Sequence, residues 1–237
     1  MGKQSNIQLN GTVDNLIFYN WKGIACIRTK PDKVKQAPVA KDNAAVFGMA
    51  ANRAAILRSL LKPILPEPGN RKIIHSLDSA FRGWLKTEPL DSLLPINDIL
   101  FFNGFSFNEK TELGQLLRLP IIVSRAGNGQ LLLHIPAVNP VENIRAPVNT
   151  SEVLIQVMAA SLQIDNPSKQ DSVQSQLSIK YISGVMPAAD INLPLFTAKG
   201  RLSVVAIALQ YYEGDHEKVL VNKLPWKPAG IVGSFYN

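Results

Sequence analysis

Residues 153–164 read VLIQVMAASLQI, and this segment decides the class of fold. Successive side chains of a β-strand point to opposite faces of its sheet, so a strand with one solvent-exposed face alternates apolar and polar residues. In the first half of this segment both sets of alternate positions are mostly apolar, and Val153, Ile155 and Val157 are β-branched. We therefore expect a strand over residues 152–165 in a central position, covered on both faces.

Further strand patterns flank this segment. They lie at residues 119–124, 130–135, 173–182, 201–213, 218–221 and 231–236. Gly, Pro and Asn separate them, and the run RAGNG at 125–129 marks a hairpin turn. Short strands at this spacing are typical of a β-sandwich. We predict an antiparallel, β-sandwich-like domain of immunoglobulin- or fibronectin-like type over residues 95–237.

The N-terminal part has the pattern of a β-hairpin. Residues 13–19 read VDNLIFY and residues 24–29 read IACIRT, and both runs are rich in β-branched and aromatic residues. The Asn and Gly of the intervening NWKG favour a tight turn. Pro31 ends the second strand, and the Lys- and Pro-rich residues 32–41 have the composition of an exposed connector.

Two amphipathic helices are predicted next. Asp42 caps a helix that runs to about Leu61, and Asn70 caps a second one that ends near Lys86. With the hairpin they form a basic region over residues 1–90, so the whole chain is predicted to be an α+β protein. A stripe of small residues on the first helix allows close approach of another backbone, from this chain or from another subunit. The stripe consists of Ala44, Gly48, Ala51 and Ala55.

The N-terminal block resembles a known family. Residues 11–19 read GTVDNLIFY, residues 21–23 read WKG, and Arg28 and Pro31 follow. This is similar to an uncharacterised bacterial family, a domain of unknown function, that starts with G-x-V-x-N-x-x-F-Y-x-W-K-G-x-x-x-x-R-x-x-P. The resemblance covers about the first 65 residues. It implies an alanine-rich helix and a β-rich remainder, and it implies neither an activity nor a catalytic residue.

Catalytic and metal-binding motifs are not apparent in the sequence. His75 and Asp78 fall within about one helical turn, where a solvated helix face explains them. The run Asp215-His216-Glu217 is typical of a charged hairpin tip, because consecutive residues rarely all face one ion. The chain has one cysteine and three histidines. We therefore predict a protein that is not an enzyme and that needs no cofactor or metal.

Positive charge is concentrated at the N-terminal end. Residues 1–86 hold 14 Lys and Arg against 5 Asp and Glu, a net charge of +9, whereas residues 87–237 hold 11 against 13, a net charge of −2. The N-terminal region should therefore attract acidic surfaces. The first residues are polar and carry no secretory signal, and no apolar run approaches the roughly 20 residues of a membrane span. We expect synthesis in the cytoplasm without a membrane segment, and any later release would use another route.

These patterns favour a structural protein that associates with itself, as a homo-oligomer or as a neighbour in a filament or particle. Residues 7–9 and 231–236 would be terminal strands able to add to the sheet of another subunit. The predicted interaction residues are Phe18, Tyr19, Trp21, Lys22, Arg28, Phe235 and Tyr236. The alternative is a nucleic-acid-binding protein, since cations and aromatic rings are mixed in the basic N-terminal region.

Overall fold

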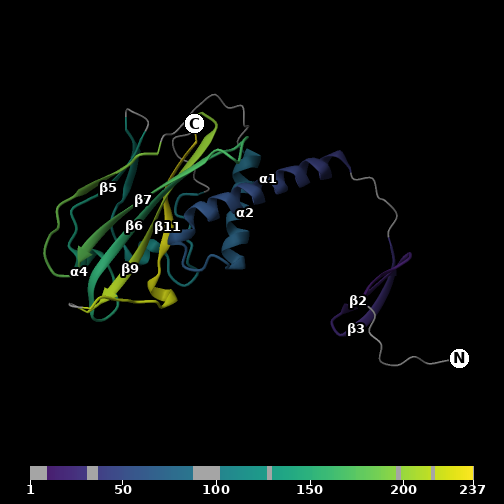
Figure 1. Cartoon of the computed structure of the whole chain (residues 1–237), viewed down its shortest axis with the longest axis horizontal. Coiled ribbons are helices and arrows are strands. Elements are labelled where there is room, and N and C mark those ends of the chain that lie inside the picture. The colour runs from purple at the N-terminus through teal and green to yellow at the C-terminus, as the bar shows by residue number, and fades with distance from the viewer. Residues whose placement is uncertain are drawn as a thin grey trace. The chain divides into compact units, whose positions relative to one another are not determined.

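The computed structural model describes residues 10–30, 37–87, 102–126, 130–195, 199–214 and 217–236, with the side chain of residue 87 left out. The chain divides into two compact units, Met1–Ala44 and Ala45–Asn237, and each is considered by itself below (Figure 1). This division differs from the predicted boundary between residues 90 and 95. The reason is that the predicted helices pack against the β-rich part and share a core with it.

The first unit contains a three-stranded antiparallel sheet, which we call the N-terminal sheet. It consists of β1 (Gly11–Val13), β2 (Leu16–Trp21) and β3 (Ile24–Thr29), in that order. The predicted hairpin is confirmed. Lys22 and Gly23 form its two-residue turn with φ of 52° and 86°, the left-handed backbone that such hairpin turns require. Asp14, with φ of 50°, makes a second turn that splits the predicted first strand into β1 and β2.

Both predicted helices are present. Helix α1 (Pro38–Leu61) begins before its expected cap at Asp42, within the predicted connector, and a 3₁₀ turn η1 (Lys62–Ile64) follows it. Helix α2 (Arg71–Thr87) begins where predicted, because Asn70 Oδ1 accepts a hydrogen bond of 2.9 Å from the Lys72 backbone N–H. The buried face of α1 lies in its second half and consists of Ala50, Arg53, Ala54, Leu57 and Leu61.

Two antiparallel sheets form the β-rich part. The larger has the order β10 (Val219–Leu220), β9 (Arg201–Glu213), β6 (Thr150–Gln163), β7 (Gln170–Lys180), and β11 (Ala229–Tyr236) pairs with β9 beside β10. The smaller has the order β4 (Ile122–Arg125), β5 (Leu131–Ile135), β8 (Ala189–Leu193). Short helical turns lie between strands: α3 (Leu113–Leu116), α4 (Pro140–Asn143) and η2 (Leu224–Trp226).

The large sheet is the middle layer of three, with α1 and α2 on one face and the small sheet on the other (Figure 1). Met158, Ala160 and Leu162 of β6 share a core with the helices, whereas Val153, Ile155 and Val157 share one with β5. The prediction that this segment is a central strand is confirmed, since β6 lies between β9 and β7. The α+β class and the antiparallel sheets are also confirmed. An immunoglobulin- or fibronectin-like topology is not confirmed.

One helical stretch, Pro38–Ile64, is long and apolar enough to cross a membrane by length and composition alone. This modifies the sequence-based expectation that no such stretch exists. However, the second half of α1 packs against the large sheet through Ala54, Leu57 and Leu61, each of them fully buried. The length and composition of a core helix satisfy the same criterion, so the residues that the structure describes show no clear membrane span.

Candidate interaction surface

The two faces of the N-terminal sheet differ in charge. The strand register places Tyr19 opposite Cys26 and Trp21 opposite Ile24 on one face, which we call the cationic face because Arg28 also lies there. Phe18 lies opposite Ile27 on the other face, and Leu16 lies opposite Thr29 and Val13. We call this second face the uncharged face, since it carries no ionisable side chain. Its members are Gly11, Val13, Leu16, Phe18, Asn20, Ala25, Ile27 and Thr29.

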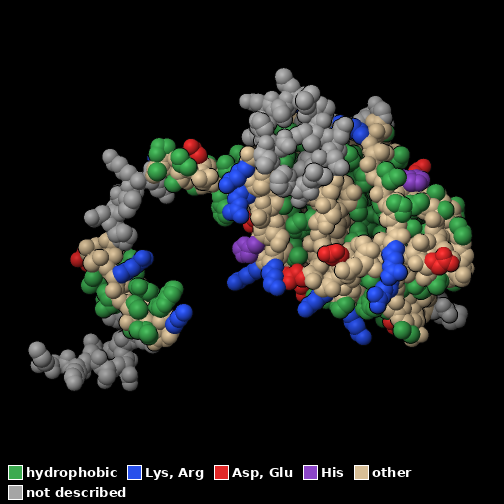
Figure 2. Space-filling view, turned by 180° about the vertical axis from the view of Figure 1, so that it is seen from behind, with side chains coloured by type: hydrophobic (Ala, Val, Ile, Leu, Met, Phe, Trp, Pro, Cys, Tyr) green, Lys and Arg blue, Asp and Glu red, His purple; other side chains and the backbone are tan. Residues whose placement is uncertain are grey.

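Apolar side chains are exposed on both faces of this sheet. Within the described residues 10–30 none is buried. Ile24 and Trp21 on the cationic face are 65% and 61% exposed, and Ile27 on the uncharged face is 62% exposed. Figure 2 shows apolar side chains gathered on this sheet together with a few Lys and Arg side chains. A small sheet needs packing on a hydrophobic face for stability, so this one is suited to being covered by a further surface.

Cations lie close to both aromatic rings of the cationic face. The Arg28 guanidinium carbon lies 5.8 Å from the centroid of the Tyr19 ring, and Lys22 Nζ lies 6.0 Å from that of Trp21. Both distances are within cation–π range, which at exposed sites contributes about 0.5–1 kcal/mol. The structure thus brings together five of the predicted interaction residues on one small sheet, although Phe18 points to the face opposite Tyr19 and Trp21.

The two other predicted interaction residues lie within the second unit. Phe235 is half-buried, with the Arg125 guanidinium carbon 5.8 Å from its ring centroid, and Tyr236 is buried against Trp84. Their strand β11 pairs with β9 of the same chain, and residues 105 and 107 cover part of its other edge by backbone hydrogen bonds to Ile231 and Ala229. Both aromatic side chains therefore pack within the second unit and are not available as an association surface. The other proposed terminal strand, residues 7–9, lies outside the described residues.

The polar groups considered for chemistry have ordinary structural partners. Asp78 Oδ1 lies 3.1 Å from Arg58 NH1, so this carboxylate joins α2 to α1 and is not set against His75. Residues 215 and 216 lie outside the described residues. Among the residues that the structure does describe, no group of three His, Cys, Asp or Glu side chains could hold a metal ion.

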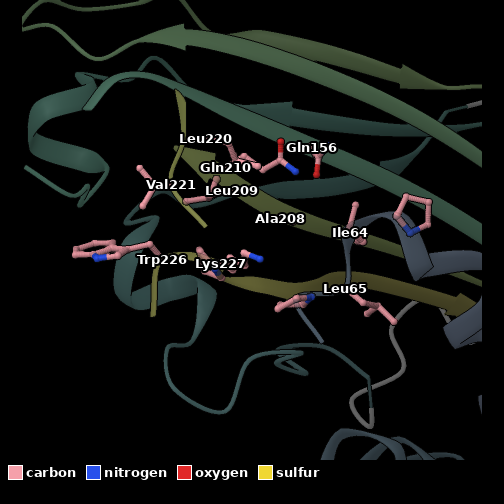
Figure 3. A pocket seen from close by; sticks show the side chains of 13 residues that line it. Ile64, Leu65, Gln156, Ala208, Leu209, Gln210, Leu220, Val221, Trp226 and Lys227 are labelled. Carbon is pink, nitrogen blue, oxygen red and sulfur yellow. The ribbon is translucent and has the colours of Figure 1, made fainter. Parts of the chain in front are cut away.

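A small cavity lies where the large sheet meets the segment after α1. Figure 3 shows Gln156 of β6 and Gln210 of β9 side by side at this cavity, with Ile64 and Trp226 also in its lining. Its volume is about 100 Å³. Sites for small organic ligands usually have about 300–1,000 Å³, so this cavity suits a few water molecules better than a substrate.

The sequence patterns did not predict two structural features, one in the N-terminal sheet and one in α1. The exposure of Val13 and Ile27 was not predicted, because alternating apolar residues indicate a strand without showing whether anything covers it. The small-residue stripe of α1 is not its packing face: Ala44, Gly48 and Ala55 are exposed, whereas the buried face follows Ala50 and Ala54.

Comparison with known proteins returned no match, either to a family model, to a curated protein or to a solved structure. The resemblance of the N-terminal block to an uncharacterised bacterial family therefore stays a prediction from the sequence.

Proposed function

We propose that this chain is a noncatalytic structural protein that associates with other copies of itself through the N-terminal sheet. The observation that carries this proposal is that both faces of the sheet carry exposed apolar side chains and that no residue of the sheet is buried within the described part of the chain. Burying a side chain such as Ile27 or Trp21 contributes about 1.5–3 kcal/mol. A partner surface would supply that burial.

The uncharged face is the better surface for meeting a second copy. Stacked sheets lie about 10 Å apart, so two uncharged faces packed on each other would bury Leu16, Phe18 and Ile27 from both copies. Arg28 would then lie on the outer face of each sheet, with both sheets separating it from its counterpart. Contact through the cationic faces would instead bring the cations of two copies together, which is unfavourable.

The size of the sheet limits the strength of a single contact. Strands of about six residues are about 20 Å long, and three of them span about 14 Å, so one face covers only about 300 Å². Stable protein interfaces usually bury at least about 1,200 Å² in total. The proposed contact alone should therefore be weak, with a dissociation constant in the micromolar range or above. It would hold copies together stably only in an assembly that uses more than one contact per copy.

Sedimentation velocity of the full chain over a range of concentrations tests this proposal. Ile27→Lys places a charge on the uncharged face, and Ile24→Lys is its matched control, because both isoleucines are in β3, are similarly exposed and lie on opposite faces. We expect Ile27→Lys to reduce association at least tenfold and Ile24→Lys to preserve it. A chain that stays monomeric at every concentration, or equal effects of the two substitutions, would contradict the proposal.

A second candidate function is binding of single-stranded nucleic acid by the cationic face. The observation in its favour is that Tyr19 and Trp21 lie on one face with Arg28, and that Lys22 lies beside Trp21. Bases stack on aromatic rings while cations contact phosphates, so binding should weaken steeply with salt. Fluorescence anisotropy with a labelled oligothymidylate would detect it, and Trp21→Ala should abolish it. Binding that is absent at low salt removes this candidate.

We also propose that α1 remains within the protein and does not enter a membrane. Its buried half carries Arg53, which donates a hydrogen bond of 2.7 Å from Nε to the Ile164 carbonyl oxygen at the end of β6. Binding of the chain to liposomes in a flotation assay would contradict this proposal.

A further inference from the structure

Strand β7 forms one edge of the large sheet. It has 11 residues and pairs with β6 in an unbroken register from Gln170 opposite Leu162 to Lys180 opposite Glu152. Among the described strands, β6 is its one neighbour in the sheet. An edge strand of this length offers its outer backbone groups to another strand.

The direction of the backbone groups follows from the register. The Tyr181 N–H donates to the Ser151 carbonyl oxygen at 2.9 Å, so the odd-numbered residues of β7 bond to β6. The even-numbered residues direct their N–H and carbonyl groups outward, and these residues are Gln170, Ser172, Gln174, Gln176 and Ser178. Within the described part of the chain, no backbone hydrogen bond reaches their outward groups.

The middle of this strand lacks the sequence devices that usually prevent strand addition. Residues 172–179 read SVQSQLSI, without a charge, a proline or a glycine, and their register contains no bulge. Other edges in this molecule are better protected. β4 has four residues and ends at Arg125, β8 has five and contains Asp190, and β11 is partly covered by the backbone of residues 105 and 107.

We propose that β7 pairs with the β7 strand of a second copy, antiparallel about a two-fold axis at Ser175. This alignment joins the two large sheets into one continuous sheet. Gln174 would lie opposite Gln176 of the partner in a hydrogen-bonded pair, and Ser175 would lie opposite its own counterpart in a closer pair without backbone bonds. This interface goes beyond the proposed contact of the N-terminal sheet and does not depend on it.

The side chains of β7 complement one another in this alignment. Val173 and Leu177 lie on the inner face of β7, are half-buried and pack against the core of the two sheets. In the two-fold alignment each Val173 lies opposite Leu177 of the partner, so the apolar layer continues across the junction. Lys180 lies opposite the uncharged Gln170, whereas a parallel alignment would place like charges side by side.

Two different two-fold contacts on one chain have a consequence for assembly. A contact through the N-terminal sheet and a contact through β7 would link copies in alternation, and such a series forms an open chain unless its geometry closes. The contact through the N-terminal sheet is small, so we expect such chains to lengthen only at high protein concentration.

Charge substitution at the axis residue tests the β7 contact directly. Sedimentation velocity is measured on the full chain carrying Ile27→Lys, which removes the other proposed contact. In that background Ser175→Lys and Ser175→Glu, measured separately, should each weaken dimerisation at least tenfold, because like charges would meet at the axis. An equimolar mixture of the two should restore it. Circular dichroism melting of each variant checks that the fold is intact.

The outcomes separate the two proposals. If the unsubstituted chain associates and the Ile27→Lys chain is monomeric at all concentrations, the β7 contact is wrong while the N-terminal contact stands. If Ile27→Lys changes nothing and the mixture of Ser175 variants restores dimers, the N-terminal contact is wrong and the β7 contact stands. Two Ser175 variants that dimerise like their parent, or a mixture that stays dissociated, would overturn the β7 contact.

Cross-linking provides a second measurement. In a Cys26→Ser chain, which has no other cysteine, Ser175→Cys should form a disulfide-linked dimer on mild oxidation, because residues facing each other at the axis have Cα atoms about 4.5 Å apart. Gln176→Cys is the matched control, since this residue would face Gln174 of the partner. Equal yields of linked dimer from the two variants would contradict the axis at Ser175.

Discussion

The ring of Trp84 in α2 meets the ring of Tyr236 near the end of β11, edge to face, with centroids 5.3 Å apart. Trp84 also contacts Phe81 and Phe102, so Tyr236 is part of an aromatic cluster between α2 and the large sheet. The last strand is therefore part of the core of the second unit.

Replacing Tyr236 should accordingly weaken folding. We expect Tyr236→Ala to lower the free energy of unfolding by about 3 kcal/mol, through lost burial and the cavity it leaves. Tyr19→Ala is the control: this ring is 38% exposed, and its removal should change stability by less than about 0.5 kcal/mol. Urea denaturation followed by circular dichroism measures both. An unchanged midpoint for Tyr236→Ala would show that β11 does not stabilise the fold.

The sequence predicted those elements whose pattern is local. The double-faced apolar run at 153–164 was sufficient to place β6 in the centre of a sheet, and the Asn and Gly between the first two strand patterns were sufficient for a hairpin. β8 was missed because Ala189–Leu193 is short and contains Asp190 and Asn192. Its pairing with β5 depends on residues more than fifty positions away, which a local pattern cannot encode.

The candidate surfaces were less predictable than the elements. A strand's composition does not show whether it lies at the edge of a sheet: β7 is an edge strand because β6 is its one neighbour among the described strands. The terminal strand β11 was expected to be available to other subunits, but tertiary pairing with β9 buries it. For the N-terminal sheet, the sequence located the aromatic and cationic residues, whereas only the register between β2 and β3 showed that Arg28 shares a face with Tyr19 and Trp21.

Close packing between β11 and β4 requires glycine at position 233. A Cβ atom there would lie 2.9 Å from the Val123 Cβ, and both atoms are held by strand backbone. We expect Gly233→Ala to destabilise the fold by about 1–3 kcal/mol. The matched control is Gly48→Ala in α1, where nothing lies within 4 Å of the added methyl group, and it should be stabilising by up to about 1 kcal/mol. In thermal melting, Gly233→Ala should lower the melting temperature and Gly48→Ala should raise it. Shifts of the same sign for the two variants would contradict the proposed close packing at Gly233.

A buried arginine attaches α1 to the end of β6. Arg53 is 8% exposed, and besides its bond to the Ile164 carbonyl oxygen it donates from NH1 to Asn52 Oδ1 at 2.8 Å. Burial lowers the pKa of its guanidinium, and the nearby Asp165 charge partly opposes this. Arg53→Met would leave the Ile164 carbonyl without this donor, so we expect a loss of about 1–3 kcal/mol in urea denaturation. Arg71→Met, at an exposed position, should lose less than about 0.5 kcal/mol, and equal losses would contradict the anchoring role.

The carboxylate of Glu152 should make part of the stability dependent on pH. A hydrogen bond from Lys218 and, secondarily, one from the Ser178 hydroxyl lower its pKa. Because the folded pKa lies below that of the unfolded chain, about 4.3, the stabilisation is present at neutral pH and is lost as the pH falls through the folded value. Lys218 is half exposed, with 53% of its side chain accessible, so solvent screening keeps the effect below about 1 kcal/mol.

Thermal melting of Glu152→Gln at two pH values measures this contribution. At pH 7 the variant should melt slightly below the wild-type chain, and at pH 2–3 the two should melt together, because the wild-type carboxyl is then protonated as well. Added salt should narrow the difference at pH 7, since the lysine is accessible to ions. Glu112→Gln, at an exposed position, is the control and should show no such convergence. The melting temperatures of wild type and Glu152→Gln could instead differ equally at both pH values. The lost interaction would then not depend on the carboxylate charge, and Glu152 would act through packing.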